Sequence, residues 1–178
     1  MERRNGYLLL ENIISIVVIS IIIAVSYQLL LFTYNTKTKL EDKVELQQQS
    51  NEIMKYIEDV IENSKGIISV NSKIINEGEV IDAVSIKCRY RNDMLDTKVK
   101  DKEISLKQNL NKVFVNTLNN SGNSESGGYE IGDYIDSMYI TSENNGKFIN
   151  IKLELSKNNE KLDTEFKVNI RNFEGEKS

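Results

Sequence analysis

The most apolar stretch of the chain runs from Tyr7 to Phe32 and reads YLLLENIISIVVISIIIAVSYQLLLF. Its roughly 26 residues would form a helix of about 39 Å, at about 1.5 Å per residue, which is enough to cross the roughly 30 Å hydrocarbon core of a bilayer. Arg3 and Arg4 precede the stretch, and the next basic residue is Lys37. Because basic residues favour the cytoplasmic side, the sequence predicts one membrane helix with its start inside and the rest of the chain exported.

Glu11 interrupts this apolar stretch near its beginning. A carboxylate costs up to about 2.5 to 3.5 kcal/mol at the centre of a membrane helix and less near an end, so a functional partner is the usual explanation. The alternative is that Glu11 lies among the lipid headgroups and stabilises the positive end of the helix.

The order of residues around Glu11 resembles the N-terminus of type IV prepilins and pseudopilins. A basic leader ends at Gly6 and is followed by Tyr7-Leu8-Leu9-Leu10-Glu11 and then by an aliphatic stretch. The resemblance implies that a prepilin peptidase removes residues 1–6 by cutting after Gly6, and that Tyr7 becomes the N-methylated first residue. It also implies that the Glu11 carboxylate meets the new amine of a neighbouring subunit during assembly.

The chain departs from this family in two respects. Tyr7 stands where phenylalanine is usual, and the helix lacks the proline that many major pilins carry, which predicts a straighter helix. A conventional secretory signal cut after Ala24-Val25-Ser26 is the competing interpretation. It would release a soluble domain that begins at Tyr27.

Beyond Phe32 the sequence contains no glycine or proline before Gly66, so one helix from about Leu8 to Ser64 is predicted, with Gly66 as its stop. The second half of this helix is amphipathic. Its apolar residues recur mostly at spacings of three and four and predict a stripe that packs on a sheet: Leu40, Val44, Leu46, Ile53, Ile57, Val60 and Ile61.

The C-terminal third predicts an antiparallel meander of three strands. Residues 148–155 alternate so that Ile149, Ile151, Leu153 and Leu155 share a buried face, and residues 165–171 repeat the pattern with Phe166, Val168 and Ile170. Residues 134–141 form the preceding strand. Hairpin turns are predicted at 144–146 and 157–159. A helix followed by such a meander, with an Arg171-Asn172 ending, is similar to J-type minor pseudopilins and related minor pilins.

The middle of the chain gives weaker patterns. Val84, Ile86, Cys88 and Tyr90 predict an alternating inward face, and further strands are expected at 67–75, 104–106 and 113–118. Alternating charges from Asp93 to Lys107 predict a solvated edge hairpin. The segment 119–132, rich in Asn, Ser and Gly, predicts a mobile surface loop because its spacing fits neither an EF-hand nor a phosphate loop.

Composition excludes several classes of chemistry. The 178 residues include no histidine and a single cysteine, Cys88, which removes histidine-based catalytic arrangements, histidine-ligated metals and an intrachain disulfide. Cys88 is expected to be a buried apolar residue. The net charge of −4, without a long basic tract, argues against nucleic acid as a partner. No catalytic, cofactor-binding or metal site is predicted, and no small-molecule substrate.

Together these patterns predict an α+β protein in which a long N-terminal helix packs on an antiparallel sheet. The expected divisions are a leader at 1–6, a transmembrane or filament-core helix at 7–32, and an extracytoplasmic domain at 33–178. The predicted role is a minor pilin or pseudopilin that moves from the cytoplasmic membrane into a surface filament. Its expected partners are other pilin subunits, the prepilin peptidase and the membrane. A membrane-anchored or secreted binding domain is the alternative.

Overall fold

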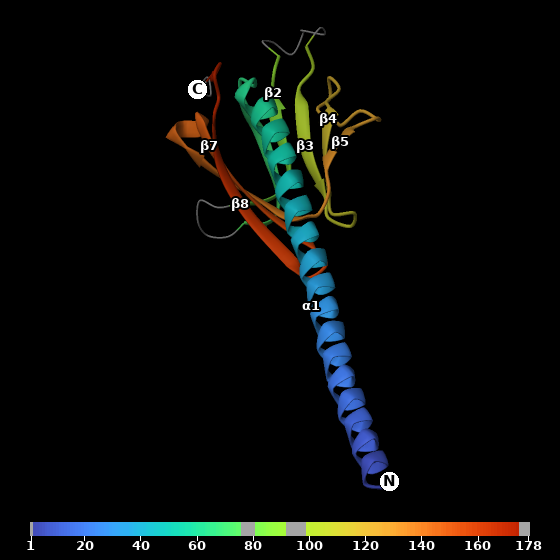
Figure 1. Cartoon of the computed structure of the whole chain (residues 1–178). Coiled ribbons are helices and arrows are strands. Elements are labelled where there is room, and N and C mark those ends of the chain that lie inside the picture. The colour runs from blue at the N-terminus through green and yellow to red at the C-terminus, as the bar shows by residue number, and fades with distance from the viewer. Residues whose placement is uncertain (1, 76–80, 92–98, 175–178) are drawn as a thin grey trace. The chain divides into compact units, whose positions relative to one another are not determined.

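The computed structural model describes residues 2–75, 81–91 and 99–174 (Figure 1). The chain divides into two compact units, Met1–Glu41 and Asp42–Ser178. Helix α1 (Glu2–Glu62) supplies the first unit and the beginning of the second. All remaining elements belong to the second unit, and its strands form one antiparallel sheet. The predicted α+β fold, a long N-terminal helix with an antiparallel sheet, is therefore confirmed.

Over residues 66–75, 81–91 and 99–174, the sheet has eight strands and a fork at its centre. The strands are β1 (Gly66–Ile75), β2 (Ile81–Arg89), β3 (Lys102–Lys107), β4 (Lys112–Thr117), β5 (Tyr129–Gly132), β6 (Ile135–Glu143), β7 (Phe148–Lys157) and β8 (Glu160–Asn169). Their order is β5-β4-β3-β2-β6-β7-β8, and β1 pairs with β2. Along the edge of β2 that faces away from β1, residues 85–88 pair with β3 and residues 81–82 pair with β6. β2 therefore joins the β3–β5 sheet to the β6–β8 meander.

The predicted meander is confirmed in strand order, facing and turns. β6, β7 and β8 are consecutive neighbours, and Ile149, Ile151, Leu153 and Leu155 are buried on one face of β7. A short 3-10 turn, η1 (Asn144–Gly146), links β6 to β7. Asn144, Asn145 and Asn158 adopt positive φ angles in the two turns, a conformation that asparagine tolerates better than most residues.

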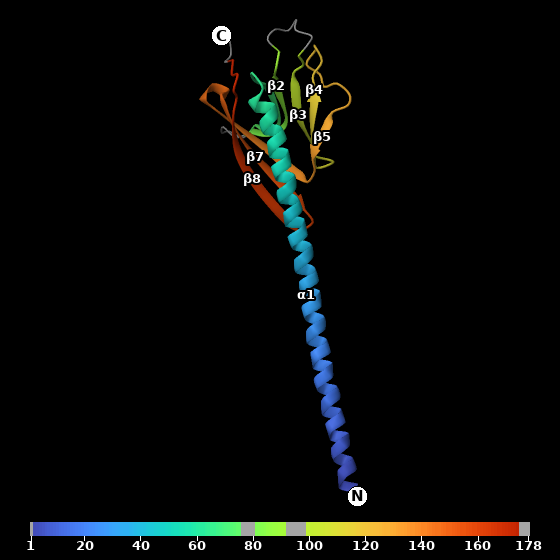
Figure 2. The same ribbon diagram turned by 45° about the horizontal axis from the view of Figure 1, so that its top comes forward.

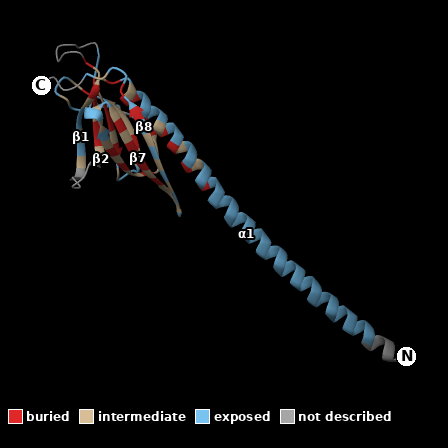
Figure 3. Cartoon of the chain, turned by 90° about the vertical axis from the view of Figure 1, so that its left-hand side faces the viewer, coloured by how far each residue is buried: buried red, intermediate tan, exposed pale blue. Residues whose placement is uncertain are grey.

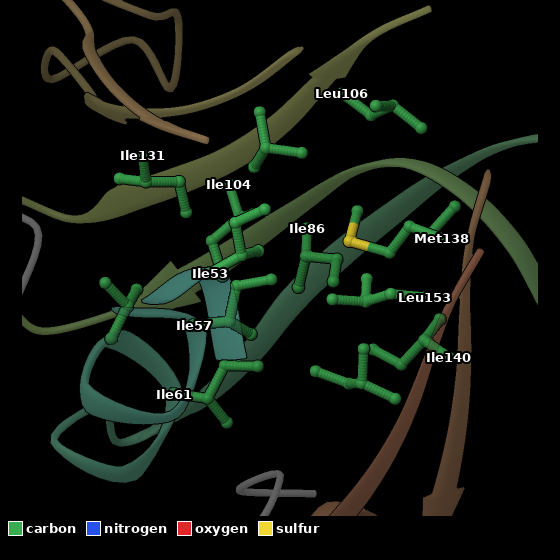
Figure 4. Packing of buried hydrophobic residues seen from close by; sticks show 14 of the residues in the cluster. Ile53, Ile57, Ile61, Ile86, Ile104, Leu106, Ile131, Met138, Ile140 and Leu153 are labelled. Atoms are coloured by element: carbon green, nitrogen blue, oxygen red, sulfur yellow. The ribbon is translucent and has the colours of Figure 1, made fainter. Parts of the chain in front are cut away.

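Within the second unit, α1 packs its apolar stripe onto the sheet. Five of its side chains belong to the buried core: Leu46, Ile53, Ile57, Val60 and Ile61. Figure 4 shows Ile53, Ile57 and Ile61 facing Ile86, Ile104 and Met138 of the strands. Figures 1 and 2 show this part of α1 across the curled sheet, with β7 and β8 on one side and β3 to β5 on the other.

The prediction of the apolar stripe was wrong for its first two residues, Leu40 and Val44. Leu40 and Val44 are 61% and 58% exposed. In the second unit the first inward position is taken by Asp42, which is 8% exposed and lies against the polar turn between β7 and β8. The apolar contact begins only at Leu46, because the helix there faces a turn rather than a strand.

The end of the helix also differs from the prediction by two residues. α1 ends at Glu62 rather than Ser64, and Gly66 begins β1. The buried hydroxyl of Ser64 donates to the carbonyl oxygen of Ile61 at 2.7 Å and accepts the Gly66 N–H at 3.3 Å. Ser64 therefore satisfies backbone groups that helix termination leaves unpaired.

Three predictions for the middle of the chain need correction. Tyr129–Gly132, assigned to a loop, forms strand β5 and pairs with β4. The charged stretch that predicted an edge hairpin contains β3, which lies between β2 and β4 and carries the buried Glu103; residues 92–98 of that stretch lie outside the described residues. On β2, Ile86 and Cys88 are buried as predicted, but Val84 is only half-buried and Ala83 is buried instead, because the pairing with β1 contains register shifts. Tyr90, the residue after β2, packs against the core as predicted, and its hydroxyl donates to the Val60 carbonyl oxygen.

Candidate functional site: the apolar N-terminal helix

The first unit presents an apolar helix without a covering layer of its own. Every side chain from Tyr7 to Glu41 is exposed, as the pale blue helix in Figure 3 shows. The helix includes a window with a mean hydropathy of 2.7, long and apolar enough to cross a membrane. A helix that is apolar on all sides needs an apolar environment, supplied by lipid or by other helices. The predicted membrane-length helix is therefore present.

The hydroxyl groups inside this helix are satisfied by its own backbone. Ser15 donates to the Glu11 carbonyl oxygen at 2.9 Å, and Ser20 donates to that of Ile16 at 2.8 Å. Thr33 makes the same bond to Leu29 at 2.8 Å. Such bonds lower the cost of placing a hydroxyl in an apolar environment, because no donor is left without an acceptor.

Glu11 is the exception to this internal pairing. Its carboxylate is exposed and has neither a hydrogen bond nor an ion pair with any residue that the structure describes. Tyr7, which is 73% exposed, lies four residues earlier, on the same face of the helix. Gly6 lies within α1. The roles assigned to Gly6, Tyr7 and Glu11 stay predictions, but no residue in the described part of the chain pairs with the Glu11 carboxylate.

At the start of the second unit, a polar cluster fixes α1 to the β7–β8 turn. We call Asp42, Glu45, Tyr134, Lys157 and Asn158 the Lys157 cluster. The Lys157 ammonium pairs with the Glu45 carboxylate and lies 3.4 Å from Asp42 Oδ1. The Tyr134 hydroxyl donates to Glu45 at 2.8 Å, and the Asn158 amide donates to Asp42 at 2.8 Å.

The pKa values of this cluster shift as its geometry requires. The hydrogen bond from Lys157, followed by that from Tyr134, lowers the pKa of the Glu45 carboxyl. The hydrogen bond between Lys157 and Glu45 raises the pKa of the Lys157 ammonium. The hydrogen bond between Tyr134 and Glu45 raises the pKa of the Tyr134 hydroxyl. All three shifts favour the charged pair with a protonated tyrosine, so the cluster is a stable anchor at neutral pH.

The segment after β4 is held by buried polar groups, contrary to the prediction of a mobile loop. Arg91 Nε donates to Asp101 at 2.9 Å, and its other nitrogens reach Asn120 Oδ1 and the Asn119 carbonyl oxygen. Arg91 and Asp101 are 8% and 7% exposed. The Asn119 side chain in turn accepts the N–H groups of Ser121 and Asn123. The turn is therefore tied to the start of β3.

Cys88 is buried on the inward face of β2, which confirms the prediction for its placement. Burial raises the pKa of its thiol to about 12. The thiolate that a nucleophilic or metal-binding cysteine requires is therefore disfavoured at this position. Among the residues that the structure describes, no group of three or more acidic or cysteine side chains is arranged to hold a metal ion.

The sequence indicated the helix and Glu11, but it gave no sign of the Lys157 cluster. Lys157 and Glu45 are 112 residues apart, and each looks like an ordinary surface charge in its own segment. Only the packing of α1 against β7 and β8 brings them together. Comparison with known proteins gives no further assignment: no family model, no curated protein and no solved structure matches this chain.

Proposed function

We propose that this chain is a pilin-like filament subunit, a minor pilin or pseudopilin of a type IV pilus, competence or type II secretion-like filament. The observation that carries the proposal is Glu11, an exposed carboxylate near the start of an exposed apolar helix that pairs with none of the residues described by the structure. A bundle of like helices would supply both the apolar environment and a cationic partner. The α+β architecture is compatible with a pilin-like fold.

The proposed sequence of events follows from the residues at the start of the helix. A prepilin peptidase cuts after Gly6 on the cytoplasmic side, where the missing side chain leaves the scissile bond unhindered. The cut creates a cationic amine at Tyr7. Because Tyr7 and Glu11 lie four residues apart, the amine of one subunit can meet the Glu11 carboxylate of its neighbour when the helices are staggered by about one turn, or about 6 Å.

Before assembly the chain would be a single-pass protein of the cytoplasmic membrane, with its second unit outside. The second unit has a core of its own, which includes the stripe of α1 from Leu46 to Ile61. It therefore has no need of the apolar helix for its own packing. The role needs no catalysis; its partners are other pilin subunits, and the order of helix and meander favours a J-type minor subunit.

The mass of the mature protein tests this proposal. The chain is expressed in a host with a prepilin peptidase and in the same host without it, and intact mass is measured after purification from membranes. Loss of Met1–Gly6 and gain of one methyl group, only where the peptidase is present, is the expected result. Loss of all residues through Ser26 would identify a secretory signal, and an uncut chain in both hosts would favour the anchored binding domain; either result overturns the proposal.

A further inference from the structure

Within the apolar helix of the first unit, most of the polar residues lie on one side. Six polar residues other than Tyr27 occur between residues 12 and 33. At about 100° per residue, four of the six lie within about 60° of one another around the helix axis: Asn12, Ser15, Ser26 and Thr33. The other two, Ser20 and Gln28, lie on other sides of the helix.

The four residues belong to a heptad repeat, whose remaining positions are mostly apolar. Positions 12, 19, 26, 33 and 40 are seven residues apart, and so are positions 8, 15, 22, 29 and 36; we call these ten positions the heptad seam. Its other members are Leu8, Ile19, Ile22, Leu29, Thr36 and Leu40. The whole seam is exposed. Leu40, which is 61% exposed, therefore belongs to this seam rather than to the stripe that packs on the sheet.

The period of the seam fits a pair of helices. Its members are alternately four and three residues apart, which gives a period of 3.5 residues. On a straight helix such a repeat drifts by about 20° per heptad, whereas a left-handed supercoil of two helices keeps it at their contact. The small side chains of Ser15 and Ser26 allow two backbones to approach closely within a membrane. The seam is therefore suited to a second helix.

Asn12 indicates which helix fits the seam. Its side chain is exposed, and its amide makes no hydrogen bond with any described residue. An unpaired amide is costly in an apolar environment, but it carries both an acceptor and donors, so two such amides can satisfy each other. Asparagine at this position of a heptad repeat favours helices paired in register. Two copies that enter the membrane in the same direction place Asn12 at the same depth, so the fitting partner is a second copy of this chain.

We propose that two copies of this chain pair in the membrane through the heptad seam, as parallel helices whose Asn12 amides are hydrogen-bonded to each other. The contact is isologous, because both copies use the same surface. The pairing involves neither the Glu11 charge nor a new amine at Tyr7, so it can form while the leader is still attached. It therefore goes beyond filament assembly and requires only that the helix crosses a membrane.

Disulfide formation between single introduced cysteines tests this pairing. The full chain is expressed in a bacterial host without a prepilin peptidase, and the isolated membranes are oxidised with copper phenanthroline. Ser26→Cys and Ile22→Cys place a thiol on the seam, whereas Ala24→Cys places one on the opposite side of the helix at nearly the same depth. The chain without an added cysteine is the blank, because Cys88 is buried in the second unit. Retention in the membranes after an alkaline wash shows that each variant is inserted.

The role of Asn12 is tested in the Ser26→Cys background. Asn12→Leu removes the amide from the seam. Gln28→Leu is the matched control, because it removes an amide that lies about 160° away from Asn12 around the helix.

Ser26→Cys and Ile22→Cys are expected to form disulfide-linked dimers, with twice the mass of the chain, at least fivefold more than Ala24→Cys. Asn12→Leu should lower the dimer yield at least fivefold, and Gln28→Leu should leave it unchanged. Equal yields at the three cysteine positions, or an unchanged yield with Asn12→Leu, would overturn the proposal. Disulfide-linked products that contain a host protein instead of a second copy would overturn it as well. Because the host lacks the peptidase, none of these outcomes depends on the leader cleavage that the proposed function requires.

Discussion

Ile53 of α1 lies directly over Gly132 at the end of β5, and its side chain occupies the space that a Cβ atom at residue 132 would need. Gln49, one helical turn earlier, accepts the N–H of Asp133 through its side-chain oxygen at 3.3 Å. The missing side chain at Gly132 therefore allows α1 to approach the sheet closely enough to bury Ile53 completely.

Gly132→Ala should lower the free energy of unfolding by about 1 to 3 kcal/mol, the usual cost of overpacking a core. Replacing a glycine with alanine stabilises a chain by about 0.4 to 1 kcal/mol through the unfolded state. The steric clash outweighs this gain, because Ile53 is β-branched and fully buried. Urea denaturation followed by near-ultraviolet circular dichroism measures the change.

Ile53→Ala in the Gly132→Ala background is the control, since it removes both the Cγ1 and the Cδ1 atoms that meet the new methyl group. The double variant should lose less stability than the sum of the single variants, which is the signature of two residues in contact. Strict additivity would show that Ile53 and Gly132 do not restrict each other.

Sequence patterns predicted β7 and its turns because local residues decide them. β7 alternates over its full length, and the asparagines that flank it supply the positive φ angles of tight turns. β5 was missed because only Ile131 of its four residues is buried, so no alternation marks it. Helical periodicity likewise identified the apolar stripe of α1. It did not show at which residue of the helix the contact with the sheet begins, so Val44 was predicted to be buried although it is exposed.

The sequence likewise predicted only part of the candidate site. Glu11 stands out in the sequence because a carboxylate in an apolar stretch is unusual. The Lys157 cluster depends on residues that only the folded sheet brings together, such as Glu45 with Lys157. Its members are ordinary residues within their own segments, and no local pattern distinguishes them.

Acid should weaken the Lys157 cluster. The pKa of Glu45 is lowered in the folded state, so its contribution to stability is present above the ordinary carboxyl pKa of about 4.5 and is lost as the pH falls through its lower, folded value. The melting temperature should therefore fall more steeply below about pH 4.5 in the wild type than in Lys157→Met, which has already lost the pair.

Alkaline solution gives the matching test. The pKa of Lys157 is raised, so its contribution to stability is present below about pH 10.5 and is lost as the pH rises through its higher, folded value.

Lys161→Met is the control for both pH ranges. It removes an exposed lysine outside the cluster and should keep the acid dependence of the wild type. Identical pH profiles for Lys157→Met and the wild type would contradict a stabilising role for the pair.

Gly6→Leu should leave the leader attached, because a side chain at the scissile bond hinders the peptidase. Intact mass in the host with the peptidase should then include residues 1–6, and the chain should stay in the membrane. Ser15→Leu introduces the same side chain within the apolar helix and should be processed normally. Normal processing of Gly6→Leu would count against cleavage after Gly6.

Glu11→Gln keeps size and hydrogen bonding but removes the charge that we assign to a neighbouring Tyr7 amine. Leader cleavage and membrane insertion should survive, while incorporation into filaments, measured by immunoblot of sheared filaments, should fall at least tenfold. Glu41→Gln, an exposed carboxylate that pairs with Lys37 at 3.6 Å, is the matched control and should be incorporated normally. Wild-type incorporation of Glu11→Gln would refute the pairing.

A fragment of residues 38–178 should be soluble and folded without lipid, because the second unit has its own core, which includes Leu46 to Ile61 of α1. Since helix and sheet share that core, its thermal unfolding should be a single transition. The fragment would be examined by size exclusion and by circular dichroism. Aggregation that is relieved only when residues 7–32 are restored would show that the amphipathic part of α1 requires other subunits.

Ile57→Asp in this fragment tests the core directly. Ile57 is fully buried between α1 and the sheet, so the substitution places an unpaired charge there and should cost about 3 to 5 kcal/mol of unfolding free energy. Asn51→Asp adds the same charge to the exposed face of the same helix and should change stability by less than about 0.5 kcal/mol. Equal melting temperatures for the two variants would mean that the stripe of α1 does not pack on the sheet in solution.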